Sequence, residues 1–169
     1  MNDHKKFMRE ALKEARKAFD KGEVPVGAVA VHEGHIIARA HNKRELMVDP
    51  TAHAEILCIQ KAAKKLGGWR LGNVTLYSTL EPCPMCTGAI IHARLKELVF
   101  GSPDPKAGGC GGRVDLLEEG LFNHTLTLIK GVLAKESSDI MKSFFLKLRN
   151  GKTYSRRSKK FVEYLLPRK

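Results

Sequence analysis

Two cysteines separated by two residues are the first groups in this chain that could do chemistry. Cys83 and Cys86 form a Cys-x-x-Cys pair, with a proline on each side of Cys83. Such a pair can be a redox couple, one half of a structural zinc site, or two buried thiols. The prolines suit a fixed ligand better than an attacking thiol. Pro84 fits the first turn of a helix, and Cys83 would then lie at the positive helix end that favours a metal-binding thiolate.

The chain lacks the second cysteine pair that a structural zinc site commonly uses. Cys58 lies within a predicted helix and is expected to be a small buried hydrophobe. Cys110 stands between glycines, and no role is predicted for it. Two thiolates and one histidine would leave one tetrahedral position open, which is typical of a catalytic zinc.

His53 is the histidine best placed to complete this set, because Glu55 follows two positions later. Residues two apart in a regular helix point about 200° apart, so His53 must lie at the start of a helix with Glu55 in its first turn. A glutamate there could simply complement the helix dipole. Beside zinc, it can take a proton from water, deliver it to a ring nitrogen and protonate the departing ammonia. Glu55 is therefore the predicted catalytic residue. The predicted zinc ligands are His53, Cys83 and Cys86.

The elements that must position these residues follow from the spacing of apolar side chains. Strands are predicted over residues 26–32, 35–41, 74–79, 97–101 and 125–130. Helices are predicted over residues 5–20, 53–66, 83–93 and 134–149, with further helical turns at 114–119 and 155–166. A hairpin followed by alternating strands and helices indicates an α/β chain. We expect a three-layer α/β/α arrangement, with a mixed five-stranded sheet and helices on both faces.

Length and composition favour one globular domain over residues 1–169. The chain is 43% hydrophobic and 28% charged, which is ordinary for a soluble protein. No apolar run approaches the ~20 residues that span a bilayer, and the first residues lack the features of a secretory signal. We therefore expect no membrane partner and a cytoplasmic location with reduced thiols.

The net charge of +12 is concentrated at the end of the chain. Residues 150–169 carry seven lysines and arginines against Glu163 alone, so this basic C-terminal extension holds half of the net charge. It can be a solvated tail, or it can attract phosphates by counterion release. Charge alone does not identify the partner.

The zinc residues belong to a longer pattern. His53-Ala54-Glu55 and Pro82-Cys83-Pro84-Met85-Cys86 match the zinc deaminase signature His-x-Glu … Pro-Cys-x-x-Cys. Further stretches resemble the bacterial tRNA-specific adenosine deaminases, within the cytidine-deaminase-like superfamily. They are residues 23–29 (EVPVGAV), 41–42 (HN), 49–56 (DPTAHAEI), 76–90, 100–106 and 139–149.

This resemblance implies a fold, a reaction and a set of binding residues. The fold would be cytidine-deaminase-like, in a homodimer with one Zn²⁺ per subunit. The enzyme would convert the wobble adenosine of a tRNA anticodon, that of the arginine ACG tRNA, to inosine. Carried over by position, Asn42 would hydrogen-bond the flipped purine, and the Ala54 backbone would lie near the zinc-bound oxygen. The residues expected to contact flanking nucleotides are Asp104, Lys106 and Phe145.

Two other functions remain open at this point. A small-molecule deaminase acting on guanine or cytidine would carry nearly the same motif. The basic extension favours RNA instead. The 23-residue connection over residues 102–124 is long enough for a helix and a parallel fifth strand, an arrangement that resembles the polynucleotide-acting branch of the superfamily. A non-catalytic zinc module that only binds RNA would not need Glu55.

Overall fold

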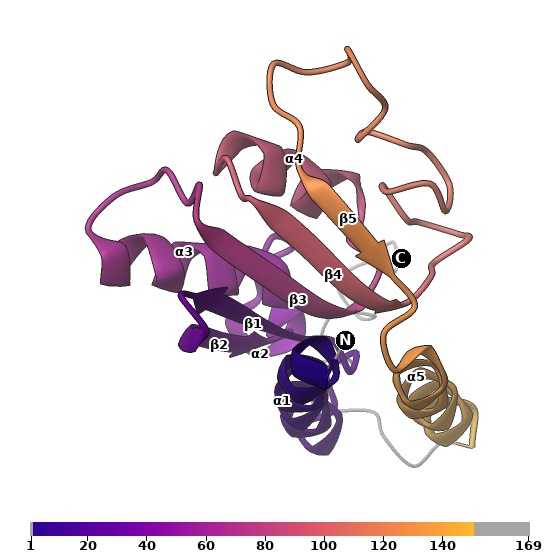
Figure 1. Ribbon diagram of the computed structural model, residues 1–169. Helices are drawn as coiled ribbons and strands as arrows, with labels where there is room; N and C mark the ends of the chain where they lie inside the picture. Colours follow the sequence, from indigo (N-terminus) through magenta and orange to yellow (C-terminus); the bar gives the residue numbers. More distant parts are fainter. Residues whose placement is uncertain (1, 151–169) are drawn as a thin grey trace, which may run out of the picture.

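A five-stranded mixed sheet forms the centre of the computed structural model, which describes residues 2–150 (Figure 1). The strand order is β2-β1-β3-β4-β5. The strands are β1 (Gly27–His32), β2 (His35–His41), β3 (Val74–Leu80), β4 (Glu97–Ser102) and β5 (Thr127–Lys130). β1 runs antiparallel to β2 and β3, whereas β3, β4 and β5 are parallel. The predicted mixed sheet with a parallel fifth strand is confirmed.

Helices cover both faces of this sheet, so the predicted three-layer arrangement is confirmed. α1 (Asn2–Asp20) and α5 (Ala134–Arg149) cover one face, and α3 (Ala54–Leu66) and α4 (Pro84–His92) cover the other (Figure 1). The alternation of side chains along β1 serves both layers. Val29 faces the α1 layer, and the next residue faces the α3 layer.

The β1–β2 hairpin turns at the predicted residues. Glu33 and Gly34 both have positive φ, 50° and 76°, as a two-residue turn of the type I′ class requires. α1 then lies directly on the start of β1, because Gly27 has no side chain and a Cβ there would collide with the α1 backbone at Ala11 and Ala15. The close approach fixes the end of the hairpin from which Asn42 continues.

Two local predictions differ from the structure. The predicted helical turns at 114–119 are wrong: this segment forms non-helical turns and a bridge between Cys110 and Asp115. Its amide groups are satisfied locally, since Leu116 donates to the Gly109 carbonyl and Leu117 to the Asp115 carboxylate. A one-turn helix, α2 (Arg44–Met47), was not predicted.

The described residues exclude Met1 and nearly all of the basic C-terminal extension. The C-terminal basic residues 151–169, with the predicted turns at 155–166, lie outside the described residues. Within residues 2–150, no helix is both long enough and apolar enough to cross a membrane.

Candidate active site

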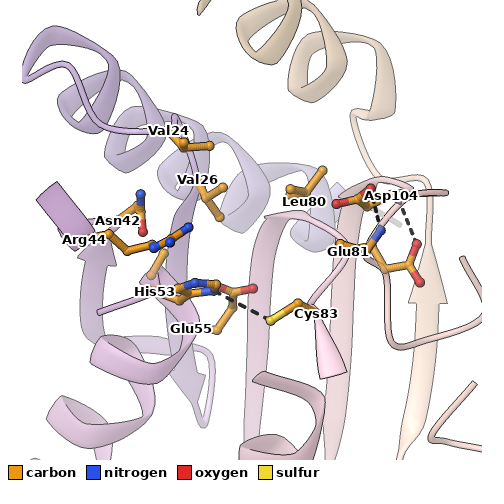
Figure 2. Close-up of a pocket in the computed structure, with 12 residues that line it drawn as sticks. Val24, Val26, Asn42, Arg44, His53, Glu55, Leu80, Glu81, Cys83 and Asp104 are labelled. Atoms are coloured by element: carbon orange, nitrogen blue, oxygen red, sulfur yellow. Dashed lines mark hydrogen bonds between the residues drawn. The ribbon is translucent and has the colours of Figure 1, made fainter. Parts of the chain in front are cut away.

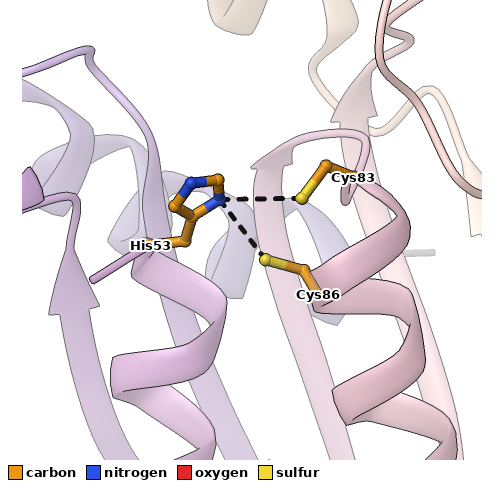
Figure 3. Close-up of side chains that lie close together, drawn as sticks. All are labelled: His53, Cys83 and Cys86. Carbon is orange, nitrogen blue, oxygen red and sulfur yellow. Dashed lines mark hydrogen bonds between the residues drawn. The ribbon is translucent and has the colours of Figure 1, made fainter. Parts of the chain in front are cut away.

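His53 and Cys83 hold equivalent places in front of two helices (Figure 3). His53 is the N-cap of α3 and Cys83 is the N-cap of α4, both with extended backbone angles. Pro84 takes the first turn of α4, where its missing N–H removes no helical hydrogen bond. Cys86 lies three residues after the cap, a spacing that brings cap and first-turn side chains together. The positive ends of two helices thus face one point.

The three predicted ligand atoms form one cluster. They all lie within 4.8 Å of one another. Nδ1 of His53 is 3.7 Å from Sγ of Cys83 and 3.5 Å from Sγ of Cys86 (Figure 3). Ordinary Zn–N and Zn–S bonds in tetrahedral geometry would put nitrogen and sulfur about 3.6 Å apart. The donor set and its spacing therefore fit a single zinc ion.

Hydrogen bonds within the cluster keep one thiol ionised. Bonds from Cys86 and His53 lower the pKa of the Cys83 thiol to about 4, although partial burial opposes this. The bond to Cys83, together with burial, raises the pKa of Cys86. The bond to Cys83 also raises the pKa of His53. Cys83 is thus a thiolate at neutral pH, the form that binds metal.

Glu55 reaches the same place from the first turn of α3. Its side chain is 4% exposed, and burial raises its pKa to about 7. Because His53 precedes the helix, the two side chains reach one pocket although a single residue separates them (Figure 2). A carboxyl group that titrates near neutral pH can both accept and release a proton, as general acid–base chemistry requires.

A pocket of about 140 Å³ opens over Glu55 and the candidate zinc ligands. It is lined by the ends of β2 and β3, by α2, by the start of α3 and by the loop after β4 (Figure 2). Its lining residues are Val24, Val26, Asn42, Arg44, His53, Ala54, Glu55, Leu80, Glu81, Cys83, Asp104 and Ala107. Apolar walls with a few convergent polar groups are typical of a ligand-binding pocket.

Comparisons with known proteins identify the family. A family model of MafB19-like deaminases matches residues 2–149. Over 158 residues the chain is 50% identical to the tRNA-specific adenosine deaminase of Bacillus subtilis (strain 168), covering 94% of this chain and 98% of the relative. The chain belongs to the tRNA-specific adenosine deaminase family. The Haemophilus influenzae member is 49% identical over 148 residues, which cover 87% of this deaminase and 86% of the relative.

Solved structures agree with this assignment. A structure from a study of A-to-I editing by tRNA:A34 deaminases superposes with a TM-score of 0.77 at 43% identity, covering 79% of this deaminase and 97% of that chain. The guanine deaminase of Nitrosomonas europaea has a TM-score of 0.73 at 22% identity, over 83% of each chain. At that identity it supports the fold alone.

The structure brings three of the five predicted nucleotide-binding residues to the pocket of this deaminase. Asn42, Ala54 and Asp104 line it. Lys106 is exposed on the loop after β4, and Phe145 is 44% exposed on α5; neither lines the pocket. These two positions can meet only parts of a ligand that extend beyond the pocket.

Two charged residues that line the pocket, Arg44 and Glu81, and one buried behind it, Glu23, were missed by sequence reasoning. Arg44 lines it from α2. The buried Glu23 accepts hydrogen bonds from the Asn42 side chain at 3.3 Å and from the backbone N–H of Leu46 at 2.7 Å, which anchors α2. Glu81 is buried beneath the loop after β4. Both glutamates lie in the stretches that resemble the family, EVPVGAV and LEPCPMC, but nothing local indicates which amides they would bind.

Proposed function

We propose that this chain is a zinc-dependent hydrolytic deaminase that converts the wobble adenosine of a tRNA anticodon to inosine. The proposal rests on one observation: His53, Cys83 and Cys86 lie at the same pocket as Glu55, a buried residue whose pKa is raised to about 7. It occurs in a chain that is 50% identical to a tRNA-specific adenosine deaminase.

His53, Cys83 and Cys86 would hold the zinc ion. The fit rests on the donor types, on the 3.5 Å and 3.7 Å separations and on the thiolate character of Cys83. Zinc supplies a Lewis acid that makes water a usable nucleophile at neutral pH. Three protein ligands leave a position for chemistry, whereas a structural site would close it with a fourth.

Glu55 would carry the protons. Overall, adenosine and water give inosine and ammonia, so both protons of the water leave its oxygen, one for the ring nitrogen and one for the amine. Glu55 accepts the first proton and passes it to the ring nitrogen next to the reacting carbon. It then accepts the second proton from the added hydroxyl group and gives it to the amine, which leaves as ammonia while the carbonyl forms. Burial favours this shuttle because it raises the pKa of Glu55 to about 7. Asn42 would orient the purine, and Ala54 would offer its backbone close to the reacting carbon.

An RNA substrate agrees with the size of the pocket and with what surrounds it. A cavity of about 140 Å³ admits one base, which must first be unstacked, and an anticodon loop offers such bases. Asp104 at the rim, with Lys106 and Phe145 beyond it, would contact the flanking nucleotides. We expect the arginine ACG tRNA as substrate. Charged and aromatic side chains around a base pocket are how single-stranded RNA is held.

We also propose a homodimer with one Zn²⁺ per subunit, acting in the cytoplasm. Large apolar side chains are exposed on the described surface, among them Trp69 at 59% and Leu121 at 52%, and burying them against a second copy would be favourable. Residues 1–169 would form a single domain with a basic extension at 150–169. Light scattering and zinc analysis of the purified chain measure both stoichiometries.

A substrate panel tests the proposed reaction. The zinc-loaded chain is incubated with an ACG anticodon stem-loop, free adenosine, guanine and cytidine, and inosine and released ammonia are measured. We expect inosine in the stem-loop at the wobble position and little reaction with the small molecules. Activity on guanine or cytidine without activity on RNA would support the small-molecule deaminase instead. RNA binding without any ammonia release would support a non-catalytic module.

A further inference from the structure

Glu81 is a buried carboxylate next to the site, and the reaction does not use it. It directly follows β3 and precedes Pro82, and its side chain is 3% exposed. Oε2 accepts the backbone N–H of Asp104 at 2.9 Å, and Oε1 accepts those of Cys110 at 3.0 Å and Gly112 at 2.8 Å. One side chain therefore binds both ends of the loop over residues 104–112.

We propose that Glu81 is a positioning residue that fixes the 104–112 loop as one wall of the base pocket and thereby sets the affinity for the RNA substrate. The proposal rests on the proposed function for its substrate. Its structural part, that Glu81 determines where the loop lies, does not depend on which substrate is used.

The loop depends on Glu81 because it has little regular structure of its own. Apart from the bridge at Cys110, residues 104–112 belong to no strand or helix. Gly108 and Gly112 lie so close to the Glu81 carboxylate that a Cβ on either would collide with it. The loop is thus wrapped around the carboxylate, with glycines where the contact is tightest. Since the backbone amides point at Glu81, the loop would lose partners if the charge were removed.

The same loop supplies the pocket wall. Asp104 and Ala107 line the pocket, and the bond between Glu81 and the Asp104 amide is visible beside it (Figure 2). Oδ1 of Asp104 accepts the backbone N–H groups of Lys106 at 3.0 Å and Ala107 at 3.1 Å, so this turn is internally fixed. A shift of the Asp104 amide relative to Glu81 would carry the whole turn with it.

The turn over residues 82–86, which carries two of the candidate zinc ligands, has supports that do not involve the Glu81 carboxylate. The Thr87 hydroxyl of α4 donates to the Pro82 carbonyl at 3.3 Å and to the Cys83 carbonyl at 3.0 Å. The Cys83 carbonyl also accepts the Thr87 amide in the first turn of α4. Weakening the hydrogen bonds between Glu81 and the loop amides should therefore move the pocket wall while leaving the zinc ligands in place.

The test compares Glu81→Gln with the unmodified zinc-loaded chain. Glutamine keeps the size of the side chain, but its NH2 group replaces one carboxylate oxygen and cannot accept the backbone N–H that this oxygen bound. We expect the KM for the ACG stem-loop to rise about tenfold, the loss of one charge-assisted hydrogen bond. We expect kcat to stay within about twofold and zinc to remain at one per chain. Amide hydrogen exchange should accelerate in residues 104–112.

A second variant attacks the same contact from the loop. Gly112→Ala puts a methyl group against Glu81 and the Asp104 carbonyl, so it should raise KM in the same way. Because both changes disrupt the same contact, the double variant should raise KM no further than the more severe single variant does. Matched controls are Glu14→Gln, a buried glutamate on α1, and Gly68→Ala, where a Cβ meets no atom within 4 Å. Both should leave KM and loop exchange unchanged.

The outcomes separate the two proposals. Unchanged loop exchange and KM in both Glu81→Gln and Gly112→Ala would overturn the positioning role. So would zinc loss and a fall in kcat at constant KM, which would make Glu81 a support of the metal turn. If the unmodified chain deaminates none of the substrates, the proposed function fails, and exchange in the 104–112 loop still decides whether Glu81 holds it.

Discussion

His53 and Cys83 each directly precede the first turn of a helix, and their Nδ1 and Sγ atoms lie 3.7 Å apart. The N-terminal ends of α3 and α4 therefore meet at one point. Each end carries a partial positive charge that favours anions, such as thiolates and the carboxylate of Glu55. The fold thus places candidate ligands and a favourable electrostatic field together, on two rigid helices packed against the same sheet face.

Replacing Glu55 with glutamine should separate metal binding from chemistry. Glu55 is not in the proposed ligand set, so Glu55→Gln should still bind one zinc per chain. Deamination of the stem-loop should fall by roughly 10²–10⁴-fold, the usual contribution of a general acid–base residue. Because burial already raises the pKa of this carboxyl group, a neutral side chain of the same shape should not lower the melting temperature. Full activity in this variant, measured as inosine formed in a single turnover, would rule out the proton shuttle.

The four cysteines should divide into two classes in a metal assay. Cys83→Ala removes a proposed ligand and should abolish stoichiometric zinc, with a fall in melting temperature because metal binding stabilises the folded state. Cys58→Ala is the matched control. Cys58 is buried in α3, where burial raises the pKa of its thiol to about 12, so it is a poor metal ligand. The Cys58→Ala variant should keep its zinc, and equal zinc contents for the two variants would contradict the ligand assignment.

The sequence predicted those parts of the fold that depend on local patterns. The positions of all five strands and of the four long helices follow from apolar spacing, and the His53–Glu55 spacing required a helix that begins after His53, which the structure contains. Pro84 likewise indicated where α4 begins. These features depend on neighbours within a few residues.

The parts that could not be predicted depend on partners far along the chain. α2 has backbone amides bound by Glu23, 23 residues before Leu46, and the 104–112 loop is held by Glu81, 31 residues before Gly112. The apolar spacing at 114–119 suggested a helix, but the neighbouring turns already satisfy its amides. A single sequence does not reveal which distant carboxylate a backbone amide will meet.

Two adjacent phenylalanines on α5 should respond differently to truncation. Phe144 is 2% exposed and meets Phe19 of α1 edge-on, with ring centroids 5.8 Å apart, whereas Phe145 is 44% exposed. Phe144→Ala should lower the free energy of unfolding by about 3–5 kcal/mol. Phe145→Ala should change it far less but weaken stem-loop binding, by about 1–3 kcal/mol if a base stacks on the ring. Urea unfolding and fluorescence titration with RNA measure the two effects; the opposite pattern would refute both assignments.

The buried pair of His41 and Glu14 should make the fold sensitive to mild acid. Nδ1 of His41 is 3.0 Å from Oε2 of Glu14, and the other carboxylate oxygen, Oε1, accepts a hydrogen bond from Lys17 at 2.6 Å. Burial, helped by the charges of Lys21 and Lys43, lowers the pKa of His41 despite the bond to Glu14. Burial alone would raise the pKa of Glu14, but hydrogen bonds from Lys17 and His41 bring it below the usual value.

Both pKa shifts make the folded state less stable as the pH falls. His41 and Glu14 each have a lower pKa in the folded chain than in the unfolded one, so the unfolded state binds more protons as the pH falls. The free energy of unfolding should therefore decrease below about pH 6.5, where unfolded histidine becomes protonated, and again below about pH 4.5. His41→Gln should remove the first decrease and keep the second. Urea unfolding from pH 8 to pH 4 at constant ionic strength measures this, and equal slopes for both chains between pH 7 and pH 5.5 would exclude His41 as the cause.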